Sequence, residues 1–252
     1  MLKTAVTILA LSAVFTTATT AQDLARRVAA VKDGVVRLSF ATQEGVCGNG
    51  DNISVHRGDK ERDWTSDCKA GPALVQITKS GGTITRIKTH VGGRWLPRSD
   101  ATDLGTVSPK EAVALLLGIA KSGGDAADDA IFPTVIADSV TVWPELLALA
   151  KNENATRKTR KSALFWVGQE AAEEVTKGLQ EVAEDEKQES EVRKSAVFAL
   201  SQRPNDQAVP ALIKTARTAK DPQIRKSAVF WLGQSNDPRA VDFFEEVLAA
   251  KR

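Results

Sequence analysis

One ten-residue segment occurs three times in the C-terminal half of this chain. It reads RKSALFWVGQ at Arg160–Gln169, RKSAVFALSQ at Arg193–Gln202 and RKSAVFWLGQ at Arg225–Gln234, so the copies start 33 and then 32 residues apart. Self-similarity at one fixed period is typical of repeat proteins, in which stacked copies of a small unit bury a continuous core. The repeat therefore predicts a solenoid for this half of the chain.

Each unit of the repeat is predicted to contain two helices. At about 100° per residue, Ile224, Ala228 and Leu232 of the last copy fall on one arc, which faces the second helix and the core. Trp166 and Trp231 lie on the same arc and are expected to pack in the core. A second apolar segment follows each copy after a short turn, as in AVPALIKTAR and RAVDFFEEVLAA.

A fourth, diverged copy precedes the three clear ones. The residue 33 positions before Ala163 is Ala130, in the segment DDAIFPTVIAD, and WPELLALAK follows it as a second helix. We therefore predict a mostly α fold, with an α-solenoid of about four helix pairs over residues 105–252.

Helix start signals support this division of the chain. The segment SPKE at 108–111 has the pattern of a capping box with proline at the first helical position, and the helix that it opens is expected to stop at Gly123-Gly124. Asp-Pro pairs at 221–222 and 237–238 open two helices of the repeats in the same way.

The last unit resembles a known family. The segment IRKSAVFWLGQSNDPRAVDFFEEVL is similar to a HEAT repeat of the short bacterial kind found in phycobilisome-lyase-like proteins. The match is carried by Ile224-Arg225, Ala228, Leu232-Gly233 and Asp237-Pro238. The resemblance covers residues 126–252 and implies a HEAT-like solenoid. Such repeats serve as scaffolds, adaptors and sometimes accessories of enzymes, so the resemblance implies an architecture more than an activity.

Each decapeptide begins with an Arg-Lys pair, and a solenoid would stack these pairs into a ladder. Each arginine is expected to pair with the acidic residue that precedes it, within or across repeats. The alternative is a basic strip that binds an acidic partner, to which Arg157 and Lys158 would add. The candidate partner-binding pairs are Arg160 and Lys161, Arg193 and Lys194, and Arg225 and Lys226.

A phenylalanine recurs at one register of the first helices, outside the core arc. These side chains either pack between adjacent repeats or form an exposed apolar stripe for a partner, for the N-terminal region or for a second copy of the chain. The register holds Phe132, Phe165, Phe198 and Phe230, which we take as candidate partner-binding residues.

The repeats contain neither His nor Cys, which removes the commonest catalytic and metal-binding side chains. Their acidic clusters at 173–174 and 184–186 are expected to be solvated. We therefore predict no catalytic residue in the repeats.

Residues 22–104 have the pattern of a small β-rich domain that follows a short amphipathic stretch, DLARRVAAVK. In 35–41, Val36, Leu38 and Phe40 alternate with polar residues, as in a half-buried strand. The segment 73–95 predicts a hairpin with its turn at Gly81-Gly82. GVCGNGDN reads as a loop, NISVHRG as a further short strand, and RSDATDLGTV at 98–107 as a linker.

The only two cysteines, Cys47 and Cys68, lie in this region and predict a disulfide that staples its limited core. The alternative is a metal site with His56 and His90, but these residues lack the spacing of metal ligands. The acidic loop residues Asp51, Asp59, Asp63 and Asp67 do not follow the spacing of a calcium loop. We expect no metal and no cofactor.

The first residues predict an exported protein. Lys3 is followed by an apolar run over 5–15 and by small residues up to Ala21, which is the layout of a signal peptide of residues 1–21, cleaved before Gln22. The apolar run is too short to span a bilayer, which takes about 20 residues. The predicted location is periplasmic or secreted.

A formal net charge of +2 argues against nucleic acid as a partner. We predict a non-catalytic scaffold or adaptor that binds another protein, with no transmembrane segment after cleavage and with self-association left open. The rival hypothesis is a ligand-binding or enzymatic β-rich domain that the solenoid supports, including a lyase-like accessory role. A cleft with converging polar groups near His56, Trp64, Asp67 and His90 would favour this rival.

Overall fold

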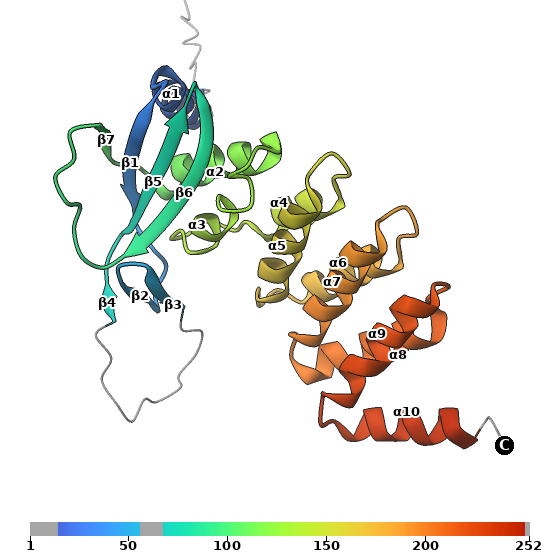
Figure 1. Cartoon of the computed structure of the whole chain (residues 1–252). Helices are drawn as coiled ribbons and strands as arrows, with labels where there is room; N and C mark the ends of the chain where they lie inside the picture. Colours follow the sequence, from blue (N-terminus) through green and yellow to red (C-terminus); the bar gives the residue numbers. More distant parts are fainter. Residues whose placement is uncertain (1–14, 56–67, 250–252) are drawn as a thin grey trace, which may run out of the picture. The chain divides into compact units, whose positions relative to one another are not determined.

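The computed structural model describes residues 15–55 and 68–249 of the chain. Figure 1 shows a β-rich N-terminal region followed by a succession of helices in the C-terminal region. This order of β-rich and helical regions confirms the corresponding prediction from the sequence.

The contacts within the chain divide it into two compact units. Unit 1 comprises Met1–Leu116 and Ile136–Val140, and unit 2 comprises Leu117–Val135 and Thr141–Arg252. The division falls inside helix α2 (Pro109–Ser122), whereas the sequence analysis placed a domain boundary between residues 104 and 105.

A four-stranded sheet with strand order β6-β5-β1-β7 forms the centre of unit 1. Strand β1 (Gly34–Phe40) pairs antiparallel with β5 (Ala73–Ser80), which pairs antiparallel with β6 (Thr83–Val91). The predicted burial of Val36, Leu38 and Phe40 in β1 is confirmed, but the expected alternation is not, because Val35 and Arg37 are buried as well. The predicted hairpin is confirmed as well, with Gly81-Gly82 in its turn.

The segment read as a linker is in fact a strand. Residues of β7 (Ala101–Thr106) pair in parallel with β1 and form one edge of the sheet. Its side chains are exposed or half-buried, so the strand has none of the alternation of buried apolar residues that sequence reasoning uses. It is held through backbone pairing at the edge instead.

A small second sheet carries the disulfide. It has the strand order β3-β2-β4, from β3 (Asn52–Val55), β2 (Val46–Asn49) and β4 (Lys69–Ala70). The predicted Cys47–Cys68 disulfide is confirmed. The prediction of a loop for GVCGNGDN is wrong for the residues of β2. Gly48 lies within this strand, and its surroundings explain why the residue is a glycine. A Cβ at Gly48 would stand 2.6 Å from the carbonyl oxygen of Val91, so only glycine allows β2 to lie this close to β6.

Helix α1 (Phe15–Ala30) belongs to unit 1 and buries Leu24 and Val28, one turn apart. The buried Lys79 of β5 donates a hydrogen bond to the Val28 carbonyl oxygen at 2.8 Å, which fastens the end of α1 to the sheet. Burial lowers the pKa of this lysine. Of the described helices, none combines the length and apolar character that crossing a membrane requires.

The described helices of unit 2 that follow α2 succeed one another as four pairs, and both helices of the last pair begin with a proline. Each pair joins a first helix to a second helix through a short turn. The pairs are α3 (Ile131–Val135) with α4 (Trp143–Lys151), α5 (Arg157–Gly168) with α6 (Glu174–Glu184), α7 (Ser190–Ser201) with α8 (Asn205–Thr218), and α9 (Pro222–Gly233) with α10 (Pro238–Ala249).

The predicted helix starts are confirmed. Ser108 and Glu111 exchange hydrogen bonds between side chain and backbone at the start of α2, as a capping box requires. Asp221 accepts from the Gln223 backbone N–H at 2.8 Å at the start of α9, and Asp237 accepts from that of Arg239 at 3.0 Å at the start of α10. These caps set where each helix of the repeat begins.

The diverged first copy has only a short first helix. Helix α3 ends at Val135, and the residues that follow, Ile136–Val140, belong to unit 1: within that unit the backbone N–H of Asp138 donates to the carbonyl oxygen of Ala41 at 3.0 Å, and that of Gln43 donates to the carbonyl oxygen of Ile136. The first helix of this pair is therefore cut to five residues.

Candidate functional site

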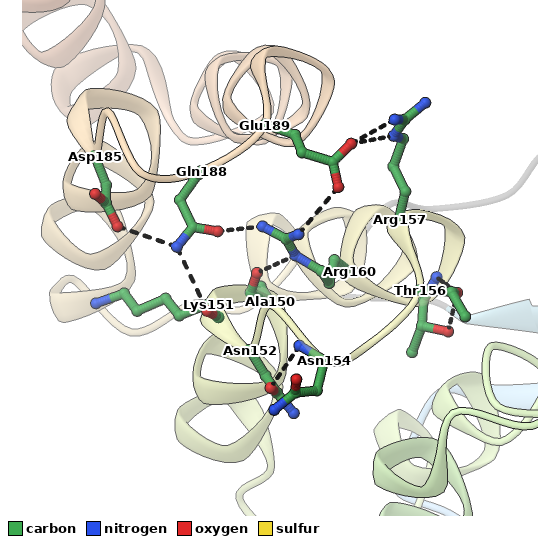
Figure 2. Close-up of polar contacts among 11 residues, drawn as sticks. Ala150, Lys151, Asn152, Asn154, Thr156, Arg157, Arg160, Asp185, Gln188 and Glu189 are labelled. Atoms are coloured by element: carbon green, nitrogen blue, oxygen red, sulfur yellow. Dashed lines mark hydrogen bonds and ion pairs between the residues drawn. The ribbon is translucent and has the colours of Figure 1, made fainter.

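Arg160 ties successive repeats together, as Figure 2 shows. Its side chain is 2% exposed, and its Nε donates to the carbonyl oxygen of Ala150, near the end of α4, at 3.0 Å. Its terminal nitrogens donate to the side chains of Gln188 and Glu189, in the turn before α7. Because the last carbonyls of a helix have no partner within the helix, this guanidinium caps α4 and binds it to the next repeat.

Arg193 repeats the arrangement one unit later. Its Nε donates to the carbonyl oxygen of Ala183, near the end of α6, at 3.0 Å, and another nitrogen donates to the Asp221 carboxylate at 3.2 Å. Asp221 is the N-cap of α9. The acidic partner of each arginine thus follows it in the chain, whereas the sequence analysis expected the preceding acid. The guanidinium groups of Arg160 and Arg193 are thus both engaged within the helical region.

Arg225, the third member of the ladder, has no acid to bind among the described residues. Its guanidinium donates to the carbonyl oxygens of Ala219 and Lys220, each at 2.7 Å. It is half-buried.

The lysines of the predicted ladder lie nearer to solvent than the two buried arginines. Lys194 is half-buried and forms an ion pair with Glu191 at 3.0 Å. Lys161 and Lys226 are exposed, and neither ammonium has an ion-pair partner in the part of the chain that the structure describes. Of the basic strip that the sequence analysis considered, only Lys161 and Lys226 are exposed without an ion pair among the described residues.

Of the two adjacent cations considered with the ladder, both have acidic partners. Arg157 pairs with Glu189 across repeats, and Lys158 pairs with Asp128 at 2.8 Å. Hydrogen bonding to Asp128 raises the pKa of Lys158.

The phenylalanine register packs against tryptophans. Phe132 packs against Trp166 of the next repeat, and Phe198 packs against Trp231 of the next repeat, each as a tilted ring pair with centroids 5.0 Å apart. Both phenylalanines are half-buried. The expectation of packing between repeats therefore holds for two of the four positions.

The other two positions are exposed, and Ala199 explains one of them. Ala199 occupies the tryptophan register of α7, so no ring of the next repeat covers Phe165, which is 41% exposed. Phe230 lies in the last described helix pair and is 56% exposed. The two tryptophans, Trp166 and Trp231, are half-buried, so the prediction that they pack in the core is wrong: they lie at the surface between the phenylalanines of successive repeats.

The exposed lysines and phenylalanines share one side of their helices. In each decapeptide the lysine precedes the phenylalanine by four residues, which is about one helical turn and places both side chains on the same face. Helices α5, α7 and α9 pack side by side. Together these positions form a surface that we call the Lys–Phe strip, made of Lys161, Phe165, Lys194, Phe198, Lys226 and Phe230.

A small cleft opens beside this strip. It has a volume of about 250 Å³ and lies among α7, α8 and α9, with Trp231 in its wall. Its other walls include the side-chain amides of Gln202, Asn205 and Gln234. These amides can both donate and accept hydrogen bonds, so the cleft suits a polar backbone segment next to an apolar side chain.

Sequence reasoning missed a further buried cation, Arg203. It is 4% exposed and donates to the carbonyl oxygen of Ala172 at 2.8 Å, to Gln207 at 2.9 Å and to Thr176 at 3.2 Å. Burial lowers its pKa. No signal marked it, because Arg203 follows the decapeptide directly and has no counterpart in the other copies: the aligned residues are Glu170 and Ser235.

The acidic clusters of the repeats lie at the surface as expected. Glu173 and Glu174 are exposed at the start of α6. Asp185 accepts hydrogen bonds from the Gln188 side chain and from the Lys187 backbone N–H, and these bonds hold its pKa below the ordinary value. Asp185 thus supports the turn that positions Gln188 for Arg160.

Unit 1 has a cleft of its own, of about 350 Å³, lined in part by His90 and Trp95. The His90 ring meets the Trp95 ring edge-on at 5.9 Å between centroids, and its Nδ1 pairs with Asp51. The other residues named for such a cleft, together with the loop acids, lie outside the described residues: His56, Asp59, Asp63, Trp64 and Asp67. Over residues 15–55 and 68–249, no three His, Cys, Asp or Glu side chains gather to hold a metal ion.

Comparison with known families agrees with the geometry of the helical region. The model of the family of HEAT repeats matches residues 176–252, which include α7 to α10 and most of α6. This match confirms the HEAT resemblance for the C-terminal part of the chain. A search of curated proteins gave no match.

Proposed function

We propose, on the premise that residues 176–252 are HEAT repeats, that this protein is an exported, non-catalytic scaffold that binds another protein through its helical unit. The observation that carries the proposal is the Lys–Phe strip. Phe165 and Phe230 expose large apolar surface beside the exposed cations Lys161 and Lys226. Large exposed apolar side chains with a charged rim are typical of protein-binding surfaces.

The side chains of the Lys–Phe strip indicate which kind of protein segment would bind to it. Its apolar positions favour a segment that buries one or two large apolar side chains, and its two exposed ammonium groups favour carboxylates next to them. The amide-lined cleft beside Trp231 adds hydrogen-bonding groups for the backbone of that segment. The partner is thus a protein segment that combines acidic and large apolar residues.

Affinity capture tests this proposal. The full mature chain is immobilised and exposed to an envelope extract of its source cells, and the retained proteins are compared between the wild type and Phe165→Ser/Phe230→Ser. We expect the double variant to lose the partner, because truncating central apolar contacts of an interface costs about 2 kcal/mol or more each. The charge reversal Lys161→Glu/Lys226→Glu should lose the same partner.

The matched control is Val241→Ser/Leu248→Ser, which removes two exposed apolar side chains of α10 outside the strip. It should retain the partner. Circular dichroism of every variant confirms that the helices remain folded. Retention of the same proteins by the wild type and by both strip variants would contradict the proposed interface.

Export is a separate part of the proposal. It rests on the signal-peptide pattern of residues 1–21 and on the Cys47–Cys68 disulfide, which forms in oxidising compartments. N-terminal sequencing of the protein from its source cells should give Gln22 as the first residue. A mature chain that begins at Met1 would contradict cleavage.

A second candidate function is ligand binding by unit 1, the rival hypothesis of the sequence analysis. The cleft at His90 and Trp95 favours it, because polar side chains from several strands converge there.

A further inference from the structure

The cleft of unit 1 lies on one face of the four-stranded sheet, opposite the apolar core. Strand pairing places Arg37 of β1 directly opposite Gln76 of β5, and places Leu74 of β5 opposite His90 of β6. Alternate residues of a strand point to the same face, so these four side chains share the face that Val36 and its buried neighbours do not occupy. All four line the cleft.

The segment that follows β6 folds over this face and closes one side of the cleft. The Trp95 ring lies against the Arg37 guanidinium, 4.6 Å from Cζ to the ring centroid. The Leu96 carbonyl oxygen accepts a hydrogen bond of 2.8 Å from a terminal nitrogen of Arg37. Trp95 and Leu96 thereby form an apolar wall beside a charged group.

Arg37 is buried, and its guanidinium forms no ion pair with a carboxylate of the described residues. Its side chain belongs to a residue that is only 8% exposed, and its Nε has no hydrogen-bond partner among the described residues. A buried polar atom without a hydrogen-bond partner is costly, and in a native protein it calls for an explanation such as a bound water, ion or ligand. The Nε of Arg37 is therefore the group that an occupant of the cleft would supply with a hydrogen-bond partner.

The nearby carboxylates are already engaged. Asp51 pairs with His90. Asp100 accepts two hydrogen bonds from Arg98, at 2.5 and 2.7 Å, which lower its pKa; the field of Arg37 contributes less. Asp103, which pairs with Arg37 along the strands, accepts from the backbone N–H of Gly105 at 2.8 Å.

We propose that this cleft binds a small carboxylate with a planar, apolar body. The guanidinium of Arg37 has the planar donor geometry that matches a carboxylate, and Arg94 lines the cleft as a second cation. Leu74, Trp95 and Leu96 provide apolar walls for the body of the ligand. A volume of about 350 Å³ lies within the range of small-molecule sites. The carboxylate of Asp51 beside His90 disfavours a doubly charged anion such as phosphate.

This inference rests on the second candidate function and is independent of partner binding by the helical unit. Isothermal titration calorimetry of the full chain with phenylacetate tests it, with neutral phenylacetamide and inorganic phosphate as comparison probes. We expect saturable binding of phenylacetate and none, or at least tenfold weaker binding, of the other two, where tenfold corresponds to about 1.4 kcal/mol.

Three arginine variants locate the site. Arg37→Met should weaken phenylacetate binding by at least tenfold, which corresponds to the loss of a charged hydrogen bond of about 1.5–3 kcal/mol. Arg37 is buried, so its replacement can disturb the fold, and a second variant is therefore needed. Arg94→Gln serves this purpose because Arg94 is exposed. It should weaken phenylacetate binding several-fold without unfolding unit 1. The matched control is Arg86→Gln, an exposed arginine of β6 outside the cleft lining, which should bind as the wild type does.

Two results would overturn the inference. One is the absence of saturable phenylacetate binding to the folded wild type. The other is equal affinity in the wild type and in folded Arg94→Gln or Arg37→Met. Binding of phosphate in preference to phenylacetate would overturn the ligand class. None of these results affects capture of a protein partner by the Lys–Phe strip, so the two proposals fail separately.

Discussion

Gly168 at the end of α5 lies so close to Ala199 of α7 that a Cβ at position 168 would stand 3.0 Å from both the Cβ and the carbonyl oxygen of Ala199. Real Cβ atoms seldom come this near to such atoms, and here one of them belongs to the backbone. The contact relates two features that differ between the copies of the repeat: the size of the residue at the tryptophan position and the exposure of the phenylalanine in the preceding copy. Where α7 has a small residue in place of tryptophan, the two first helices pack closely and Phe165 is left uncovered.

The first prediction concerns this contact. Gly168→Ala should lower the free energy of unfolding by about 1 kcal/mol, because overpacking costs about 1–3 kcal/mol and the helix propensity of alanine offsets part of it. The matched control is Gly233→Ala, at the aligned position of α9, where a Cβ would meet no atom within 4 Å. The control should be neutral or stabilising in urea unfolding. Equal effects of the two substitutions would contradict the close packing.

The second prediction concerns the buried arginine ladder. Arg160→Met should lower the free energy of unfolding by about 3 kcal/mol, since it removes the donor to the Gln188 side chain, to Oε1 of Glu189 and to the Ala150 carbonyl oxygen. Arg225→Met is the control and should cost about 1 kcal/mol or less, because Arg225 binds no acid among the described residues. Urea unfolding followed by helical circular dichroism measures both. A smaller loss for Arg160→Met than for Arg225→Met would show that Arg160 does not join the repeats.

The third prediction concerns the disulfide. Cys47 and Cys68 are 21 residues apart, and a loop of this length stabilises a fold by about 3 kcal/mol through the unfolded state. The double variant Cys47→Ser/Cys68→Ser should therefore lose protection from hydrogen exchange in β2 and β5 of unit 1. The amides of α7 should keep theirs and serve as the internal control. Loss of protection in α7 to the same extent would mean that the two units unfold together.

The fourth prediction concerns acid stability. The pKa of Asp185 lies below its ordinary value of 3.8 because the Gln188 side chain and the Lys187 backbone N–H donate to its carboxylate. A carboxyl group with a lowered pKa in the folded state stabilises the fold at pH values above its pKa in the unfolded state. This contribution is lost as the pH falls through the pKa of the folded state. The free energy of unfolding of Asp185→Asn should therefore fall less steeply than that of the wild type below about pH 4. Gln188→Ala should flatten the same limb, and parallel curves would refute the assignment.

The repeat could be predicted because the same side chains recur at a fixed spacing in the sequence. The three copies of the decapeptide predicted the first helix of each unit, the residue at which it starts and most of its buried face. The last copy alone was sufficient to identify the resemblance to HEAT repeats. The exposure of single residues within the register was harder to predict. It depends on the residue that the next repeat places opposite, as the pair of Phe165 and Ala199 illustrates.

The β-rich region was harder to predict for a physical reason. Strand β7 pairs with β1 through its backbone, and its side chains are exposed or half-buried, so its sequence shows no alternation of buried apolar residues. The role of Arg37 was equally hidden. In the sequence it is a polar residue between two apolar ones, and only the fold of the segment containing Trp95 buries it.

The direction of the arginine bonds has a consequence for the synthesis of the chain. Arg160 finds its acidic partner 29 residues later, and Arg193 finds its own 28 residues later. At about 5–20 residues per second, a ribosome needs roughly 1.5–6 s to make the segment that completes each bond. Arg160 and Arg193 therefore each leave the ribosome before the acidic residue that binds them, so during synthesis these contacts between repeats can form only in order, from the N-terminus to the C-terminus.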